Sequence, residues 1–348
     1  MTIDQLVNFA RSKNASDIHL TVGAPTAVRI NGELKKFDMK DDDTNKLILS
    51  MLSADQERKL GENIDLDFSF SCSTGARQRV NVYHQNGGKL AAAIRLLNEH
   101  VPSFKDIMLP NAAIELTKEM KGLILVTGPT GSGKSTTLAT MVDYINQGRP
   151  CHILTIEDPV EYIYEAKKAT IHQREIGTDV SDFNSALRSG LRENPDVILV
   201  GEMRDYETIR LAITAAETGH LVLGTLHTTG AAQTINRIID VFPSEEQNQI
   251  RSQLSGNLRG VISQMLVPCI SQERGRVAAF EILINTDACA NNIRTEKVHM
   301  IEQVMQSSAG IGMRVMNESL KRLTRDNIIT RDIALLYSPD KEELKKML

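Results

Sequence analysis

The stretch LVTGPTGSGKSTT, from Leu125 to Thr137, decides the fold of the larger part of this chain. It contains the spacing Gly128-x-x-x-x-Gly133-Lys134-Ser135, after an apolar run and before apolar residues at helical spacing. This order predicts a strand, a glycine-rich loop and a helix that begins at the loop. The backbone N–H groups of such a loop, together with the positive end of the helix dipole, bind phosphate.

The side chains of the loop predict a nucleotide rather than a simple anion. Lys134 is expected to neutralise the β and γ phosphates of ATP, and Ser135 to offer its hydroxyl to the Mg²⁺ that accompanies ATP. The other expected nucleotide contacts of the loop are Gly128, Pro129, Thr130, Gly131, Ser132, Gly133 and Thr136. A glycine-rich turn kept for packing is the alternative, but the fixed spacing between a strand and a helix favours nucleotide binding.

Composition narrows the class of protein. The chain has 348 residues, 41% of them apolar and 24% charged, which suffices for a large core and for two or three domains. The N-terminal MTIDQLVNFARSK lacks the apolar core of a signal peptide, and no apolar run is long enough to span a bilayer, so a cytoplasmic protein is expected. A net charge of −4 and 4% aromatic residues argue against nucleic-acid binding. The cysteines form no CxxC pair, so neither a disulfide framework nor a zinc site is expected. They are Cys72, Cys151, Cys269 and Cys289.

Two domains are expected, with a boundary near residue 100. A small α+β domain at 1–98 is predicted from a hairpin turn at Asn31-Gly32 and from the strand-like runs SDIHLTVG, AVRI, ELKKF, DLDFSF, RQRVNVYHQ and AAAIRLL. Residues 99–118 are the expected linker. In 119–348 strands alternate with helices, which predicts an α/β domain with a parallel sheet covered on both faces and a helical C-terminal part.

Carboxylates follow two of the expected strands in the second domain. ILTIEDPVEY places Glu157, Asp158 and Glu161 after a buried strand, where they either reach a ligand-binding edge or cap a turn. PDVILVGEMRD ends a second strand in Gly201-Glu202, so glycine stands where an aspartate usually reaches magnesium. We therefore expect Glu202 to orient or deprotonate the attacking water rather than to bind metal directly.

Histidines and arginines complete the candidate site. His220 and His227 bracket the strand in ETGHLVLGTLHT, and more than about 20 Å of extended chain between them disfavours a shared metal. His227 is expected to sense the γ-phosphate, although satisfied polar residues at strand ends are the alternative. Arg188 and Arg192 lie four residues apart in ALRSGLRENPD, and Arg204 follows the next strand. Charge stabilisation at the site is expected of them, with surface ion pairs as the alternative.

Four motifs in order carry a resemblance to a known family: GPTGSGKSTT, TIEDPVEY, HQREIGTDVSDFNSALRSGLRENPDVILVGEMRD and TAAETGHLVLGTLHTTGAAQTINRIIDVFP. With ASDIHL and RINGEL near the N-terminus, they resemble the secretion ATPase superfamily, specifically the type IV pilus retraction ATPases (PilT-like). The resemblance implies a PAS-like N-terminal domain, a RecA-like P-loop ATPase domain, and a cytoplasmic homohexamer whose ATP hydrolysis powers pilus retraction and twitching motility. It also implies docking to an inner-membrane platform protein of the pilus machinery, at the inner face of the cytoplasmic membrane.

The resemblance also implies roles for individual residues. Lys134 and Ser135 match the Walker A site and Glu202 the Walker B position. The residues that it implies in catalysis are Glu202, Glu161, Lys134, Arg192, Arg204 and His227. It places Glu157, Asp158 and Glu161 in an Asp box and His220 and His227 in a His box. The residues that it implies toward nucleotide, besides the glycine loop, are Glu157, Asp158, His220, Arg79, Arg95 and Arg188.

The direction of movement depends on further features of the resemblance. Assembly motors of the superfamily carry a tetracysteine zinc element and a longer N-terminal region, and this sequence has neither, which favours retraction without zinc. The retraction motif AIRNLIREGK corresponds here to ACANNIRTEK, Ala288 to Lys297, which departs at five positions. An accessory retraction paralogue is therefore the alternative, followed by a pilus assembly or type II secretion ATPase. A nucleotide-gated regulator without turnover and a nucleic-acid motor are less favoured.

Overall fold

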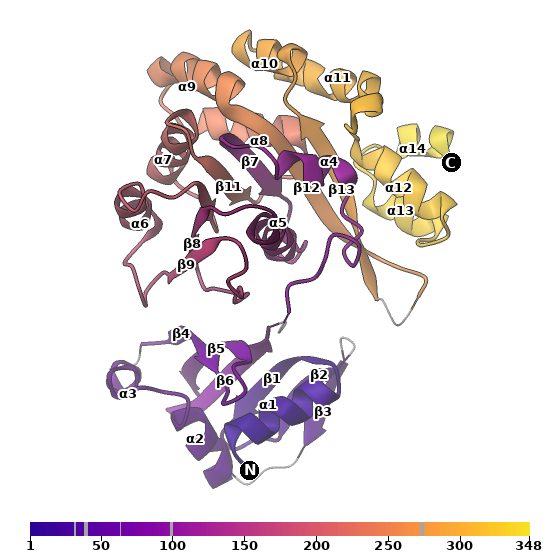
Figure 1. The fold of residues 1–348 in the computed structure, drawn as a ribbon. Coiled ribbons are helices and arrows are strands. Elements are labelled where there is room, and N and C mark those ends of the chain that lie inside the picture. Colours follow the sequence, from indigo (N-terminus) through magenta and orange to yellow (C-terminus); the bar gives the residue numbers. More distant parts are fainter. Residues whose placement is uncertain (31–32, 38–40, 63, 98–99, 272–274) are drawn as a thin grey trace. The chain divides into compact units, whose positions relative to one another are not determined.

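The computed structural model of the chain describes residues 1–348 except 31–32, 38–40, 63, 98–99 and 272–274. The chain forms two compact units (Figure 1). The first consists of residues 1–100 together with Pro159–Ile163, and the second of residues 101–158 together with 164–348. No helix among the described residues is long and apolar enough to cross a membrane.

The first unit is built on a six-stranded antiparallel sheet in the order β3-β2-β1-β6-β5-β4. Buried and less buried residues alternate along β1 and β5, so one face of the sheet carries the core. All six strand-like runs of the sequence are strands here, whereas the expected Asn31-Gly32 turn lies outside the described residues. The elements are α1 (Ile3–Ser12), β1 (Ala15–Thr21), β2 (Thr26–Ile30), β3 (Glu33–Phe37), α2 (Asp41–Leu49), α3 (Ala54–Gly61), β4 (Leu66–Ser71), β5 (Arg77–Gln85) and β6 (Lys89–Leu96).

The second unit is built on a seven-stranded sheet in the order β13-β12-β7-β11-β10-β8-β9. All neighbouring strands are parallel except β12 and β13, so the expected parallel sheet is confirmed with one antiparallel edge strand. Strand β7 is buried along its whole length, and its successive side chains enter opposite cores: Leu123 and Leu125 lie in one, Ile124 and Val126 in the other. Both faces of the sheet are therefore covered, which explains the unbroken apolar run.

The strands of this unit are β7 (Gly122–Thr127), β8 (His152–Glu157), β9 (Thr170–Glu175), β10 (Val197–Val200), β11 (Leu221–Leu226), β12 (Leu258–Pro268) and β13 (Arg276–Ile284). The α-helices are α4 (Asn111–Leu116), α5 (Lys134–Gly148), α6 (Phe183–Gly190), α7 (Tyr206–Glu217), α8 (Ala231–Asp240), α9 (Ser244–Asn257), α10 (Asp287–Arg294), α11 (Ile301–Ser307), α12 (Met316–Arg325), α13 (Arg331–Tyr337) and α14 (Lys341–Met347). Two single-turn 3₁₀ helices are η1 (Val298–Met300) and η2 (Ala309–Ile311). After β13 the described chain is helical apart from short connections (Figure 1).

Two segments depart from the simple alternation of strands and helices. Residues 111–116, expected as linker, form α4, because Ala112, Ala113 and Leu116 pack into the core that lies against β7 and α5. The crossover from β8 to β9, residues 158–169, contains neither helix nor strand. Parallel strands are usually joined by a helix, so the polar backbone groups of this crossover need other partners.

Candidate nucleotide and hydrolysis site

The glycine loop joins β7 to α5 in a conformation that favours glycine. Gly128, Gly131 and Gly133 have φ angles of 145°, 77° and 90°. A Cβ atom on Gly128 would lie 2.2 Å from the backbone oxygen of Gln264, so this position has no room for a side chain. The Gln264 side chain also donates a hydrogen bond of 2.7 Å to the Ser132 oxygen. Gln264 of strand β12 thus holds the loop in place through both its backbone and its side chain.

The helix that follows the loop begins at Lys134, as the motif predicts. Its apolar residues Leu138, Met141 and Ile145 are buried against the sheet. The Lys134 ammonium donates to the backbone oxygens of Gly128 and Pro129 at 2.8 and 3.1 Å, so the positive charge lies over the loop. A glycine-rich loop, a helix N-terminus and a lysine charge therefore lie together here, as a nucleotide polyphosphate requires.

The order of strands brings three expected site residues to one edge of the sheet. The glycine loop follows β7, His227 follows β11, Glu202 lies just after β10, and Glu157 ends β8. These four strands are neighbours in that order and run in parallel, so their C-terminal ends lie side by side. We call this end of the sheet its carboxyl edge. With about 4.8 Å between strands, Glu157 lies about 14 Å from β7 along the edge.

His227 links the glycine loop to Glu202. Its Nδ1 lies 3.4 Å from the hydroxyl of Thr130 in the loop, and its Nε2 lies 2.7 Å from Oε1 of Glu202. Arg204 forms an ion pair with the same carboxylate oxygen. A chain of polar contacts therefore runs from the tip of the glycine loop to the carboxylate that the sequence predicts to act on water.

The electrostatics of Glu202 suit that expectation in part. Burial raises the pKa of its carboxyl, but the Arg204 guanidinium and the His227 ring together outweigh burial and hold the pKa below its usual value. The carboxylate is therefore ionised at neutral pH and can accept a hydrogen bond from water. Its low pKa makes it a weak base, so orientation of water fits the geometry better than full proton removal.

Two cavities flank these residues. One, of about 290 Å³, lies beside the start of α5 and is lined by Gly133, Thr136, Thr137, Ile107, Gln264, Arg276 and Phe280 among others. The other, of about 440 Å³, is lined by Glu202, Arg204, His227, Thr228, Arg237 and apolar neighbours. The first adjoins the phosphate loop and combines apolar and polar walls, as a nucleoside site does.

The other expected residues are not all brought to this edge. His220 precedes β11 and lies at the opposite edge of the sheet, where its Nδ1 lies 2.9 Å from the Ala215 oxygen. Arg188 is exposed and pairs with Glu207 at 3.7 Å, and Arg192 donates to the Arg188 oxygen. These contacts do not involve the glycine loop. The contacts of His220, Arg188 and Arg192 thus lie within their own surroundings and do not join these residues to the loop of the same chain.

Three further expected residues belong to the first unit. Glu161 lies in the segment Pro159–Ile163, which groups with that unit, and Asp158 immediately precedes the segment. Arg79 pairs with Asp67 at 2.6 Å, and Arg95 with Asp17 at 3.4 Å. Both arginines lie on adjacent strands, β5 and β6, in direct register.

Sequence reasoning missed Gln264, which supports the loop from β12, and two residues that line the cavity beside α5. Gln264 is a buried polar residue within the apolar run VISQMLV, and that contrast was a usable signal. Arg276 and Ile107 have no such signal, because only the folding of β13 and of the segment before α4 brings them beside α5.

The sheet, its glycine loop and the Glu202–His227 pair define a P-loop nucleotide-binding protein of the α/β class. The chain belongs to the family described as Type II/IV secretion system protein, which matches residues 1–335. It is 46% identical over 337 residues to the type IV pilus retraction ATPase PilT of Pseudomonas aeruginosa, covering 96% of this chain and 97% of that protein. It is 45% identical to a twitching motility protein of Neisseria gonorrhoeae, covering 91% of this chain and 85% of that protein.

A solved structure resembles the whole described fold. The crystal structure of the pilus retraction motor PilT with bound ADP matches with a TM-score of 0.92 and 48% identity, and the match covers 99% of each chain. The expected α/β fold, with an antiparallel N-terminal sheet and a mostly parallel C-terminal sheet, is thereby confirmed. The resemblance found in the sequence motifs is confirmed as well.

Proposed function

We propose that this protein is an ATP-hydrolysing motor that powers type IV pilus retraction and twitching motility. The observation that carries the proposal is the polar chain from Thr130 through His227 to Glu202, set beside an intact glycine loop. This chain can report the γ-phosphate to the group that orients water. The relatives named as a retraction ATPase and a twitching motility protein match over nearly the whole chain, which supports retraction rather than assembly of pili.

ATP with Mg²⁺ fits the residues present. The loop has no room for a side chain at Gly128 and takes positive φ angles at three glycines, the conformation of a phosphate-binding loop, and Lys134 supplies the charge. A bound Mg²⁺ would neutralise charge that develops on the phosphates during the reaction. Ser135 in the first turn of α5 is the residue that would hold it, while Glu202 remains engaged with Arg204 and His227.

The catalytic roles and the assembly are part of the same proposal. We assign water orientation to Glu202 and γ-phosphate sensing to His227. The nucleoside is assigned to the cavity beside α5. Arg79 and Arg95 are assigned to the nucleotide of a neighbouring chain in a homohexamer, together with Arg188, Arg192 and His220. Docking to a platform protein of the pilus machinery at the cytoplasmic membrane completes the motor.

A cell lacking the protein tests the function directly. We expect such cells to assemble pili that do not retract, so that surface pili accumulate and twitching stops. The parent gene should restore retraction, and the Lys134→Ala variant should not. Cells that lose pili altogether would support an assembly ATPase instead, and cells with normal twitching that slow only under load would support an accessory retraction paralogue.

A further inference from the structure

The irregular crossover between β8 and β9 is held by side chains instead of secondary structure. It leaves β8 at Glu157, passes through the segment Pro159–Ile163 of the first unit, and returns through residues 164–169 to β9. The backbone N–H and C=O groups of such a segment bond to side chains, to other backbone groups or to water. The partners within the protein show what fixes its path.

One side chain of α5 satisfies the returning part of the crossover. Asn146, which is 0% exposed, donates through Nδ2 to the Glu165 oxygen at 2.8 Å and accepts the Lys167 N–H at 3.1 Å. The Asn146 backbone oxygen also accepts the N–H groups of Lys168 and Ala169. An asparagine in the buried face of a helix is costly unless it is satisfied, and here the crossover satisfies it.

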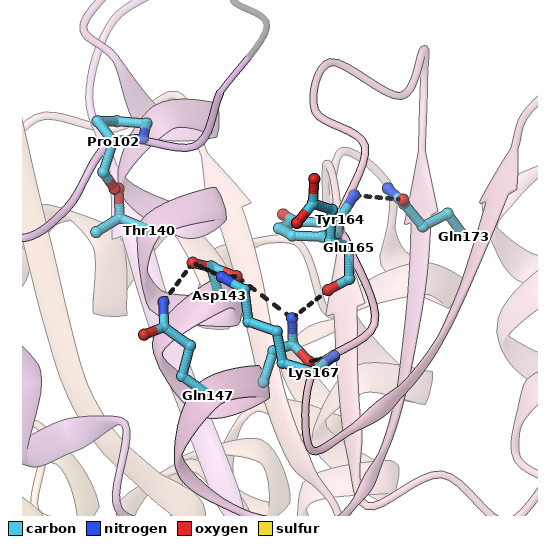
Figure 2. A network of polar contacts seen from close by, with 9 residues as sticks. Pro102, Thr140, Asp143, Gln147, Tyr164, Glu165, Lys167 and Gln173 are labelled. Carbon is cyan, nitrogen blue, oxygen red and sulfur yellow. Dashed lines mark hydrogen bonds and ion pairs between the residues drawn. The ribbon is translucent and has the colours of Figure 1, made fainter. Parts of the chain in front are cut away.

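A charged pair strengthens the same attachment. The Lys167 ammonium lies 2.8 and 2.9 Å from the two carboxylate oxygens of Asp143, one turn before Asn146 on α5 (Figure 2). Gln147 donates to Asp143 from the outer side at 2.7 Å. Since α5 begins at the glycine loop, the helix that carries the phosphate site also fixes the returning crossover.

A second residue, Gln173, contacts the chain on either side of the segment Pro159–Ile163. Gln173 of β9 accepts the Tyr164 N–H at 3.2 Å, as Figure 2 shows, and its Nε2 lies 3.5 Å from Oε1 of Glu157. Thr155 donates to the same Glu157 oxygen at 2.7 Å. Gln173 thus contacts Glu157, the last residue of β8, and Tyr164, the first residue after the segment Pro159–Ile163.

Glu157 lies close to Gly201, the residue before the Glu202 that is assigned to orient water. The Gly201 N–H donates to the Ile156 oxygen at 2.8 Å, and a Cβ atom on Gly201 would lie 3.2 Å from Cα of Glu157. Gly201 directly precedes Glu202. A shift of Glu157 would therefore move charge beside the Glu202 carboxylate.

We propose that Gln173 is a positioning residue of the ATPase site: it sets Glu157 by contacting both Glu157 and Tyr164, on either side of the segment Pro159–Ile163. The returning part of the crossover is fixed to α5, the helix after the glycine loop, by Asn146 and the Asp143–Lys167 pair. The inference rests on the proposed ATPase function. It assigns no chemistry to Gln173 itself. Its effect on turnover passes through Glu157.

The test measures steady-state ATP hydrolysis by the full chain with saturating Mg²⁺, separating kcat from KM. Gln173→Met removes both contacts at similar volume, and we expect kcat to fall by roughly tenfold while KM changes less than about twofold. Gln173→Glu keeps the acceptor for Tyr164 but places a carboxylate against Glu157, and kcat should fall again. Gln147→Ala is the matched control, because it loses a hydrogen bond of the same network without touching Gln173 or Glu157.

A double-mutant cycle decides whether Gln173 acts through Glu157. If it does, Gln173→Met should add little to the loss caused by Glu157→Gln. The inference is overturned if Gln173→Met turns over like Gln147→Ala, if Glu157→Gln alone is silent, or if the two losses multiply. A fall in the thermal midpoint that tracks the loss of kcat would also overturn it. Absence of hydrolysis by the parent protein would instead refute the proposed function.

Discussion

Replacement of Glu202 by glutamine separates catalysis from stability. The Glu202 side chain is 18% exposed, whereas its partners Arg204 and His227 are 74% and 45% exposed. Pairs with such exposed partners stabilise a fold by at most about 1 kcal/mol each. Loss of the carboxylate that orients water should lower kcat by about 10²-fold or more, equivalent to at least about 2.7 kcal/mol in the activation free energy.

The assay combines phosphate release at saturating Mg-ATP with equilibrium binding of a fluorescent ATP analogue and thermal unfolding. We expect kcat of Glu202→Gln to fall by about 10²-fold or more, nucleotide affinity to stay within about threefold, and the thermal midpoint to shift by no more than about 4 °C. Glu318→Gln is the matched control: the same substitution on α12, on a side chain that is 32% exposed and pairs with Lys321 and Arg322, neither of which is assigned to the site. Its kcat should equal that of the parent.

The pH dependence of unfolding offers an independent check. Because the pKa of Glu202 is held below its ordinary value, its pairing stabilises the fold above that value and is lost as the pH falls through the lowered pKa. The difference in thermal midpoint between parent and Glu202→Gln should therefore vanish in acid.

Equal losses of ATP binding and hydrolysis would make Glu202 a direct metal ligand, and unchanged kcat would refute its role in the reaction.

Three further predictions address the loop, the sensor and the assembly. Lys134→Ala should abolish ATP hydrolysis with the thermal midpoint of the nucleotide-free protein unchanged, and persistent turnover would contradict the role of the loop lysine. His227→Ala should lower kcat more than ADP affinity, measured by titration, because only the γ-phosphate is sensed; equal losses would contradict that role. If Arg79 and Arg95 act on a neighbouring chain, a Lys134→Ala variant mixed with a chain lacking both arginines should regain hydrolysis, whereas no recovery despite verified subunit exchange would count against a shared site.

The arginine prediction has a clear physical alternative. Arg79 and Arg95 each pair with an aspartate of their own sheet, at 2.6 and 3.4 Å. Exposed pairs of this kind contribute at most about 1 kcal/mol to the free energy of unfolding, so they can be exchanged for phosphate at low cost. A fully active monomer would leave them as surface ion pairs.

Sequence by itself determined the elements whose causes are local. Gly128-x-x-x-x-Gly133-Lys134-Ser135 predicts the loop and α5, because positive φ angles and a helix start are properties of a short stretch. The six strand-like runs predict the strands of the first unit, and the unbroken apolar run of β7 predicts a strand buried on both faces. Helical α4 was missed, because its short apolar pattern acquires meaning only when packed against β12 and β13.

Tertiary structure alone decided which of these residues meet. Both His227 and His220 flank β11, but strand direction sends only His227 to the edge where the glycine loop and Glu202 lie. Gln264 supports the loop from 132 residues away, and Gln173 reaches Glu157 across a crossover that no local pattern predicts. Strand order and crossover path arise from contacts between distant segments of the chain. Local sequence patterns therefore identify the chemical groups of the site, but only the folded sheet brings these groups within hydrogen-bonding distance.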